Sequence, residues 1–173
     1  TDHGNLFAML PFYQQAKKTG IKPIIGCEIY VSIKRHTEKK QITTSTGKKW
    51  GYHHLVLLAQ NDQGYRNLMK LCSIGYLDGF YYRPRVDKEL LKKYNKGLIA
   101  TSACLAGEVT AHAARGDYDR AKKAALEYKE IFHDRFYLEL QNHDIAAEKK
   151  AHIILKKLAK DLSIPLIATN DCH

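Results

Sequence analysis

The sequence predicts an α/β protein in which helices cover a mainly parallel β-sheet. Apolar segments of strand length alternate with amphipathic segments of helix length along the 173 residues. The strand segments are apolar at nearly every position, as expected for strands buried on both faces of a parallel sheet. This pattern fits either a closed barrel or an open doubly wound sheet. In both folds, ligands bind at the carboxyl ends of the strands.

Each element of the first half of the chain has its own sequence signal. Apolar side chains recur at helical spacing from Leu6, and Gly20 follows where a glycine commonly ends a helix. A β-rich run and a short apolar run predict two strands, and the Asn-Asp-Gln-Gly sequence at Asn61 is typical of a helix start. The polar, lysine-rich stretch between the strands predicts an exposed hairpin or a mobile loop. These elements are a helix at 6–18, a strand at 22–32, the loop at 33–51, a strand at 54–59 and a helix to about Tyr76.

The second half repeats the strand–helix unit. An aromatic and basic loop at 79–85 leads to a short helix that starts at Asp87. The sequence Leu-Ile-Ala-Thr occurs at Leu98 and again at Leu166, and each copy is followed by a polar turn that contains metal-binding residue types. Two strands are therefore expected to bring similar chemistry to one edge of the sheet. The other predicted elements are strands at 97–101, 136–140 and 165–169, and helices at 105–114, 118–132 and 146–162.

The composition favours a polyanionic partner. Lysine and arginine number 28 against 18 acidic residues, which gives a formal net charge of +10 with histidine neutral. This balance is typical of proteins that bind nucleic acid or phosphorylated substrates, although an ordinary solvated basic surface explains so diffuse an excess equally well. The four cysteines are widely spaced, and neither a signal peptide nor a long apolar run is present. We therefore expect a cytoplasmic protein with reduced thiols and no membrane contact.

Residues that can bind metals gather near the predicted strand ends. Histidine, carboxylate and thiolate ligands together favour zinc or manganese over calcium. Clusters in which carboxylates bridge several metals activate water and hold a phosphoryl group during in-line attack, so hydrolysis of phosphate esters is the predicted chemistry. Metal-assisted amide hydrolysis, as in amidohydrolases, is the alternative, and the positive net charge disfavours it mildly. The residues are Asp2, His3, Glu28, His53, His54, Cys104, Asp171 and His173.

Several sequence blocks together resemble the PHP (polymerase and histidinol phosphatase) domain at the N-terminus of bacterial DNA polymerase III alpha subunits. The blocks are, in chain order from Thr1 to His173, TDHGN, GIKPIIGCE, HLVLLAQN, GYRNLMKL, GFYYRPR, SACLAG and ATNDCH. They span nearly the whole chain and resemble the replicative polymerase more than histidinol phosphatase. The resemblance implies a distorted (β/α)7 TIM-like barrel that here lacks its first strand. It also implies that residues 1–173 are a PHP domain fragment, with the family's N-terminal His-X-His motif and the polymerase domains outside the chain.

The resemblance further implies a site for up to three divalent metals, with zinc or manganese expected and magnesium as another option. Glu28 would bridge two metals, and Glu28, His54 and Asp171 would be catalytic. His54 is preferred over His53 because it directly precedes the apolar strand, and Cys104 stands where many relatives carry histidine, so that its thiolate favours zinc. The matched ligands are His3, Glu28, His54, Cys104, Asp171 and His173.

Further residues are expected around this site. Asp2, Glu139 and His143 are predicted to support the ligands without binding metal themselves. Arg83 and Arg85, beside neighbouring aromatic residues, are predicted to bind nucleic acid, with barrel closure or contact with other polymerase domains as the alternative. The remaining histidines are predicted to lie at the surface, and they are His36, His112, His133 and His152.

By this resemblance, the chain is part of a DNA-directed DNA polymerase and removes nucleotides from DNA 3′ ends as a metal-dependent 3′–5′ exonuclease. The alternative is a catalytically inactive domain that stabilises the polymerase and docks a separate proofreading exonuclease. Ligand-capable residues at every matched position favour the first reading, and the polymerase-like blocks disfavour a free-standing phosphatase. The implied partners are DNA, the remaining polymerase domains, a proofreading exonuclease subunit and other replisome subunits.

Overall fold

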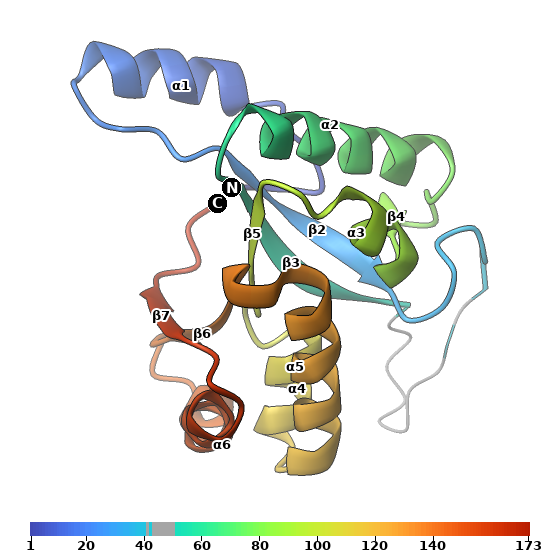
Figure 1. Cartoon of the computed structure of the whole chain (residues 1–173), viewed down its shortest axis with the longest axis vertical. Helices are drawn as coiled ribbons and strands as arrows, with labels where there is room; N and C mark the ends of the chain where they lie inside the picture. The colour runs from blue at the N-terminus through green and yellow to red at the C-terminus, as the bar shows by residue number, and fades with distance from the viewer. Residues whose placement is uncertain (41, 43–50) are drawn as a thin grey trace.

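The computed structural model describes residues 1–40, 42 and 51–173, which form a mixed α/β fold with a seven-stranded sheet (Figure 1). The strands are β1 (Asp2–His3), β2 (Gly26–Ser32), β3 (Tyr52–Ala59), β4 (Arg85–Val86), β5 (Leu98–Thr101), β6 (Phe136–Gln141) and β7 (Leu166–Thr169). The helices are α1 (Met9–Lys18), α2 (Asp62–Leu77), α3 (Lys88–Tyr94), α4 (Glu108–Ala114), α5 (Tyr118–Phe132) and α6 (Ala146–Leu162), with a 3₁₀ turn at His133–Arg135.

The predicted helices and the longer strands are confirmed to within a few residues. Two helix starts are fixed by the expected capping side chains. Asn61 accepts a hydrogen bond from the backbone N–H of Gly64, and Asp87 accepts one from Leu90. The short strands β1 and β4 were not predicted, because two residues are too few to show a periodic pattern.

The sheet is more mixed than the sequence predicts. Its strand order is β1-β2-β3-β5-β6-β7, with β4 beside β2, and β3 runs antiparallel to both of its neighbours. An antiparallel pair such as β2 and β3 needs no crossover helix, and none lies among the described residues between these strands. The predicted hairpin or loop at 33–51 falls partly outside the described residues. As a result of the reversal, His54 in the first half of β3 lies near the edge where the parallel strands end.

A closed barrel was expected, and the ends of the strand path do approach each other. Within the described residues, β1 and β7 do not pair as strands. The hydroxyl of Thr1 nevertheless lies 3.4 Å from the carbonyl oxygen of Cys172, and Nδ1 of His173 lies 3.0 Å from the carbonyl oxygen of Thr1. Figure 1 shows the two ends of the chain side by side. The two ends of the strand path therefore meet through these contacts and not through strand pairing.

The two faces of the sheet have different chemistry. One face is apolar and forms the core, which includes Cys27, Ile29, Val31, Leu55, Leu57, Ala100 and Leu138. Side chains alternate between the faces of a strand, and the opposite face carries polar residues such as Glu28, His54 and Thr101. The strand register places His3 beside Glu28, Glu28 beside Val56, and Val56 beside Thr101. The strands were predicted to be apolar on both faces, and this polar face corrects that expectation.

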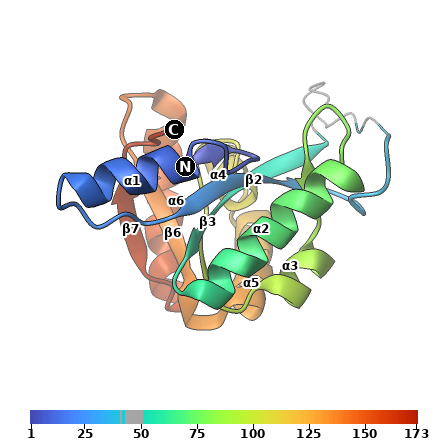
Figure 2. The same cartoon turned by 90° about the horizontal axis from the view of Figure 1, so that it is seen from above.

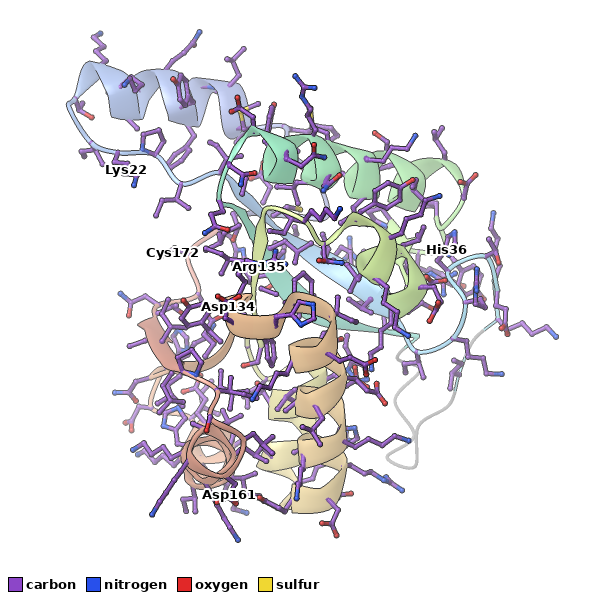
Figure 3. All side chains as sticks on the ribbon, in the orientation of Figure 1. Lys22, His36, Asp134, Arg135, Asp161 and Cys172 are labelled. Carbon is purple, nitrogen blue, oxygen red and sulfur yellow. The ribbon has the colours of Figure 1, made fainter. Side chains whose placement is uncertain are left out.

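The helices form two groups around the sheet. Helix α2 packs on β3, β4 and β5 and carries α3 against it, whereas α4, α5 and α6 pack together beside β5 and β6 (Figure 2). Helix α1 lies apart, and Ala16 is its only buried residue. Arg135, labelled in Figure 3, donates to the carbonyl oxygens of Asn95 (2.7 Å) and Leu98 (2.6 Å) and so ties the 3₁₀ turn to the start of β5. No helix in the described part of the chain is long and apolar enough to cross a membrane.

His36, labelled in Figure 3, was predicted to lie at the surface, but its side chain is buried. Its Nδ1 lies 2.6 Å from Oδ2 of Asp87, and its backbone N–H donates to the same oxygen. The nearby carbonyl of His36 accepts a hydrogen bond from Arg85. Burial tends to raise the pKa of Asp87, but hydrogen bonds from His36 and from the N–H of Leu90 outweigh it, and the net pKa is lowered below its ordinary value of 3.8.

The Asp87 carboxylate is expected to make stability depend on pH in the acid range. Because its folded pKa is lowered, the carboxylate contributes stability above the unfolded value, and this contribution is lost as the pH falls through the folded value. Asp87→Asn keeps a helix-capping residue. It should lower the free energy of unfolding by about 1–2 kcal/mol at neutral pH and flatten its pH dependence below about pH 4. Urea unfolding at a series of pH values measures both effects, and an unchanged acid slope would contradict the assignment.

Candidate metal centre

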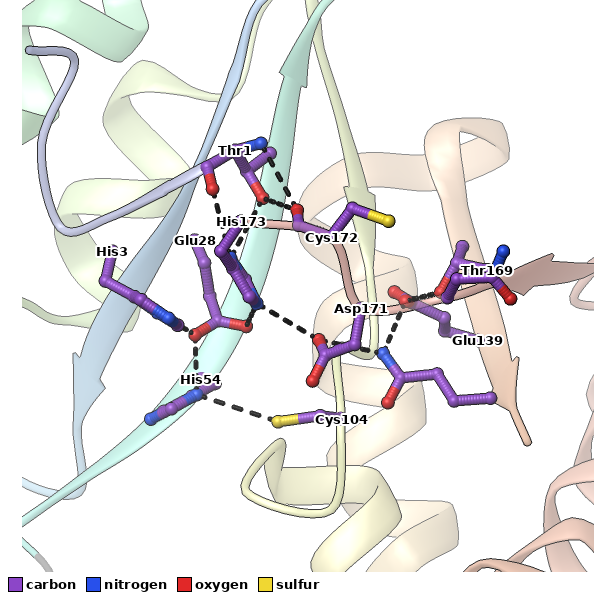
Figure 4. A network of polar contacts seen from close by, with 12 residues as sticks. Thr1, His3, Glu28, His54, Cys104, Glu139, Thr169, Asp171, Cys172 and His173 are labelled. Atoms are coloured by element: carbon purple, nitrogen blue, oxygen red, sulfur yellow. Dashed lines mark hydrogen bonds and ion pairs between the residues drawn. The ribbon is translucent and has the colours of Figure 1, made fainter. Parts of the chain in front are cut away.

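The candidate metal centre is built around Glu28, whose side chain is 0% exposed. Strand pairing places His3 of β1 and His54 of β3 on the same face of the sheet on either side of it. Nδ1 of His3 lies 2.8 Å from Oε1 of Glu28, and Nδ1 of His54 lies 2.7 Å from the same oxygen (Figure 4). One carboxylate oxygen of β2 is thus shared by two imidazoles, which come from the two strands β1 and β3 that pair with β2.

Two turns that follow strands complete the cluster. Sγ of Cys104, on the turn after β5, lies 3.7 Å from Nδ1 of His54. His173, after β7, stacks on the ring of His3 with centroids 3.9 Å apart, and its Nε2 lies 3.7 Å from Oε2 of Glu28. The ligand atoms therefore form two groups that share Glu28, one with His3 and His173 and the other with His54 and Cys104.

Asp171 adjoins this cluster through His173. Its Oδ1 lies 3.2 Å from Nε2 of His173 and accepts a hydrogen bond from Nε2 of Gln141 at 3.0 Å. The backbone of Asp171 has a φ of +54°, a conformation that few residues other than glycine adopt. This turn directs its carboxylate toward the edge of the sheet that holds Glu28 (Figure 4).

The charges within the cluster support one another. Burial tends to raise the pKa of Glu28, but the hydrogen bond and charge of His54, together with His173 and His3, outweigh it, so that the net pKa is lowered. Burial tends to lower the pKa of His54, yet Cys104 and Glu28 raise it to about 9. In the metal-free protein, His54 is therefore protonated at neutral pH beside an ionised Glu28. Metal binding at such a site releases protons.

The residues present fit a divalent metal. Oε2 of Glu28 is buried and has no hydrogen-bond partner in the part of the chain that the structure describes. A buried oxygen left without a partner costs about 1–3 kcal/mol, which a bound cation at this oxygen would offset. Imidazole, carboxylate and thiolate together suit zinc and related transition metals better than calcium.

A hydrogen-bond network behind the cluster holds Asp171. Glu139 of β6 is buried and accepts hydrogen bonds from the hydroxyls of Thr101 and Thr169. Gln141 donates to Oε1 of Glu139 (2.9 Å) and to Asp171, and so links the two carboxylates. Glu139 was expected near the site, but Gln141 was not. Its signal in the sequence is its place two residues after Glu139, on the same face of the strand.

Other residues selected from the sequence lie at the margin of the site. Oδ2 of Asp2 accepts the backbone N–H of Ala8 at 2.9 Å, so Asp2 holds the segment that leads into α1. Nδ1 of His143 lies 2.7 Å from Glu148, and its Nε2 lies 3.4 Å from the carbonyl oxygen of Asn170. Both residues therefore steady the segments that carry the candidate ligands, and neither belongs to the two ligand groups among the described residues.

The structure distinguishes the two neighbouring histidines of β3. His54 faces Glu28, whereas the ring of His53 lies near His112 of α4, with centroids 6.4 Å apart. Burial lowers the pKa of His53, although Glu108 opposes this shift. The side chain of His54 therefore lies on the face of β3 that holds the candidate site, and that of His53 lies on the other face.

Arg83 and Arg85 have different environments. Arg83 is exposed, and its guanidinium lies 5.8 Å from the centre of the Tyr30 ring. Arg85 is only 2% exposed and donates to the carbonyl oxygens of Gly79, His36 and Glu38. The expected contact of Arg85 with a nucleic acid backbone is thus corrected, because in this position its guanidinium serves to hold two loops together.

Sequence reasoning did not select two tyrosines beside His54. The rings of Tyr30 and His54 meet edge to face at 5.2 Å, and Tyr52 stacks on His54 at 6.1 Å. Gly4 lets Tyr30 approach, since a Cβ atom at this residue would lie 2.8 Å from the tyrosine ring, and its φ is +71°. Tyr30 follows Glu28 by two residues and Tyr52 precedes His54 by two, so the period of the strand could have identified both.

The fold and the site define an α/β protein with a candidate metal centre at the ends of its strands. A comparison with protein families identifies the family of the chain. The model of the PHP domain family matches residues 1–143, and the chain belongs to this family.

The curated relatives are polymerase subunits. The chain is 49% identical over its whole length to the DNA polymerase III subunit alpha of Borreliella burgdorferi and covers 15% of that protein. It is 46% identical to the subunit of Helicobacter pylori and 43% identical to that of Thermus aquaticus, again over its whole length, and covers 14% of each. The chain thus spans about one seventh of the relatives it matches, and the resemblance to polymerase PHP domains is confirmed.

Proposed function

We propose that the chain is the PHP domain of a bacterial DNA polymerase III alpha subunit and acts in DNA replication as a metal-dependent 3′–5′ exonuclease. The observation that carries this proposal is the buried Oε2 of Glu28, which accepts no hydrogen bond from a described residue and lies between two groups of ligand-type side chains. A carboxylate in this position suits the binding of more than one cation. Similarity to polymerase subunits over the whole length of this chain supports DNA as the substrate.

Each ligand residue has a role in this proposal. Glu28 would bridge two metals, with His3 and His173 on one side and His54 and Cys104 on the other. Asp171 would complete the ligand set, and Glu28, His54 and Asp171 would be catalytic. The donor set favours zinc or manganese, with magnesium as a further option and a capacity of up to three ions. The proposed ligands are His3, Glu28, His54, Cys104, Asp171 and His173.

The chemistry that divalent metals supply in such a site is the activation of water and the stabilisation of charge on the leaving 3′ oxygen. The protein's own residues fix the geometry. Glu139 and Gln141 hold Asp171. The carbonyl oxygen of Thr1, 3.0 Å from Nδ1 of His173, orients that ring and leaves its Nε2 available to a metal. Stacking of His173 on His3 and the contacts of Tyr30 and Tyr52 restrict the imidazoles. Such outer contacts commonly change metal affinity by about 10–100-fold.

Several wider features belong to the same proposal. The meeting of Thr1 with Cys172 and His173 supports a distorted (β/α)7 barrel of the PHP type. Residues 1–173 would be one part of a longer cytoplasmic polymerase. Its partners would be DNA, the other polymerase domains, a proofreading exonuclease subunit and further replisome subunits. Arg83, exposed beside Tyr30, is the residue that we assign to the nucleic acid backbone.

The variant His173→Ala tests the proposed site. Loss of this imidazole should reduce metal affinity by at least about tenfold and slow the shortening of single-stranded DNA from its 3′ end in proportion. Metal content measured after dialysis and digestion of a 5′-labelled oligonucleotide with manganese or zinc provide the two readouts. His112→Ala is the matched control, because it removes an imidazole from α4 near His53 rather than from the cluster.

The possible outcomes separate the two functional readings. Unchanged metal content and digestion in His173→Ala would refute this site. Metal-loaded wild-type protein that leaves DNA intact would overturn the exonuclease assignment and favour the inactive domain that stabilises the polymerase. Digestion that persists in His112→Ala and falls in His173→Ala would support the proposal.

A further inference from the structure

An exposed row of aromatic rings begins shortly after His3. The row consists of Phe7, Tyr76 at the end of α2, and Phe80 in the following loop. Ring centroids are 6.4 Å apart for Phe7 and Tyr76 and 6.0 Å apart for Tyr76 and Phe80. These side chains are 79%, 41% and 47% exposed, respectively. Contiguous apolar groups exposed in this way usually mark a binding surface.

The row is held in a fixed position relative to the candidate metal centre. Asn5 donates from Nδ2 to the carbonyl oxygen of His3 at 3.0 Å, and its Oδ1 accepts the N–H of Phe7 at 2.9 Å. One side chain therefore connects a proposed metal ligand to the first ring of the row. Asp2 holds the next residue, Ala8, through its backbone N–H.

The far end of the row is anchored by buried contacts. Arg85 donates from Nε to the carbonyl oxygen of Gly79 at 3.1 Å, directly before Phe80. A Cβ atom at Gly79 would lie 1.9 Å from the carbonyl oxygen of Arg85, so only glycine fits this close approach. The buried arginine thus positions the loop that presents the last ring.

The helix and the loop that carry the row also carry cationic side chains. Arg66 and Lys70 are exposed on the turns of α2 that precede Tyr76, and neither forms an ion pair with a described residue. Arg83 lies on the same loop as Phe80, against the ring of Tyr30. Asp78 is the acidic residue within this stretch. Cations on the same helix and loop as exposed rings complement a phosphate backbone that carries unstacked bases.

We propose that the aromatic row stacks on the bases of single-stranded DNA and leads its 3′ end toward the candidate metal centre. This inference rests on the proposed exonuclease function and names the form of DNA that the site takes. Stacking suits an enzyme that acts on every sequence, because each base presents a π-face. Arg66, Lys70 and Arg83 contact the phosphates, and their contacts are independent of base identity.

Binding without catalysis tests the row. The probe is a labelled oligothymidylate of about 12 nucleotides, a length within the range of known single-strand sites. Its affinity is measured by fluorescence anisotropy in the presence of EDTA, so that no cleavage occurs. Phe7→Ala, Tyr76→Ala and Phe80→Ala should each weaken binding by about fivefold or more. Tyr76→Phe, which keeps the ring, should bind like wild type.

Leu77→Ala is the matched control. Leu77 is 80% exposed and adjoins Tyr76, so its removal deletes apolar surface without deleting a ring. Equal loss of DNA binding in Leu77→Ala, or none in the ring variants, would overturn the stacking proposal. Equal binding of double-stranded DNA would also overturn it. If the wild type digests DNA but the ring variants bind DNA as tightly as it does, the proposed exonuclease function stands and the stacking proposal fails. If the ring variants bind DNA less tightly but the wild type does not digest it, the stacking proposal stands and the exonuclease function fails.

Discussion

Glu28→Gln is expected to remove metal binding and DNA digestion while the protein still folds. Glutamine matches glutamate in shape, so the buried side chain should keep its place on β2. It lacks the negative charge that would hold cations between the two ligand groups around this residue. Because even outer contacts of a metal site change affinity by about 10–100-fold, loss of the central carboxylate should reduce affinity by at least about a hundredfold.

Thermal unfolding with and without metal gives a direct measure of this effect. A metal present at about a hundred times its dissociation constant stabilises the folded protein by about 2.7 kcal/mol. Wild-type protein should show this gain, and Glu28→Gln should show none. Without metal, the variant should lie within about 2 kcal/mol of wild type, because the loss of charged contacts with His3 and His54 is offset by removal of a buried charge whose Oε2 accepts no hydrogen bond from the described residues.

A second carboxylate variant separates the site from general charge effects. Glu130→Gln changes an exposed residue of α5 by the same chemical step. It should retain both the metal-induced stabilisation and the digestion of DNA. If Glu28→Gln also retained the metal-induced stabilisation, the centre around Glu28 would not be the metal site.

Long periodic segments were the most predictable part of the fold. The bounds of α5 and α6 agree with the sequence prediction, because apolar side chains at helical spacing extend over several turns. The direction of β3 could not be predicted in this way. An apolar strand buried in a sheet has the same pattern whether its neighbours run parallel or antiparallel. The two residues of β4 gave no pattern at all.

The candidate site was likewise predictable in part. Residues at strand ends could be selected because their types suit metals, and the structure brings His3, His54, Cys104 and His173 around Glu28. Contacts that depend on which face a side chain occupies were missed. Gln141 was passed over because an amide is not a typical metal ligand, although the alternation of β6 places it beside Glu139.

Burial of charged residues was the other source of error. Arg83 and Arg85 have the same chemistry and flank one proline, yet the first is exposed and the second is buried. The partners that make burial of Arg85 tolerable are backbone carbonyls of His36 and Glu38, distant in sequence. Partners so distant in sequence cannot be predicted from composition or from local sequence pattern.

Lys88→Ala is expected to cause a large loss of stability, because this one cation holds two glutamates. Nζ of Lys88 lies 2.8 Å from Oε2 of Glu108 on α4 and 2.5 Å from Oε2 of Glu127 on α5, above the ring of Tyr128. Burial tends to raise the pKa of Glu108, but Lys88 and His53 outweigh it and the net pKa is lowered. Burial tends to lower the pKa of Lys88, yet the two glutamates raise it.

Without the ammonium group, Glu108 would be a mostly buried carboxylate whose remaining partner is the hydroxyl of Tyr128. Breaking a buried ion pair from one side costs about 3–5 kcal/mol, and partial exposure of both side chains places this one near 3 kcal/mol. Lys92→Ala, which breaks the exposed pair with Glu89, should cost far less, because solvent screens this pair. Urea unfolding of the two variants measures the difference.

The pH dependence of this loss identifies its cause. In wild type, the lowered pKa of Glu108 means that its contribution is present above the ordinary value of 4.5 and is lost as the pH falls through the folded value. In Lys88→Ala, burial should raise the pKa of Glu108. Acidification then protonates this carboxylate and removes its unpaired buried charge. The stability gap should therefore narrow below about pH 5. Adding Glu108→Gln should recover part of the loss at neutral pH, because it removes the unpaired charge. A gap that is independent of pH, with no recovery in the double variant, would mean that Lys88 acts through its packing on Tyr128 alone.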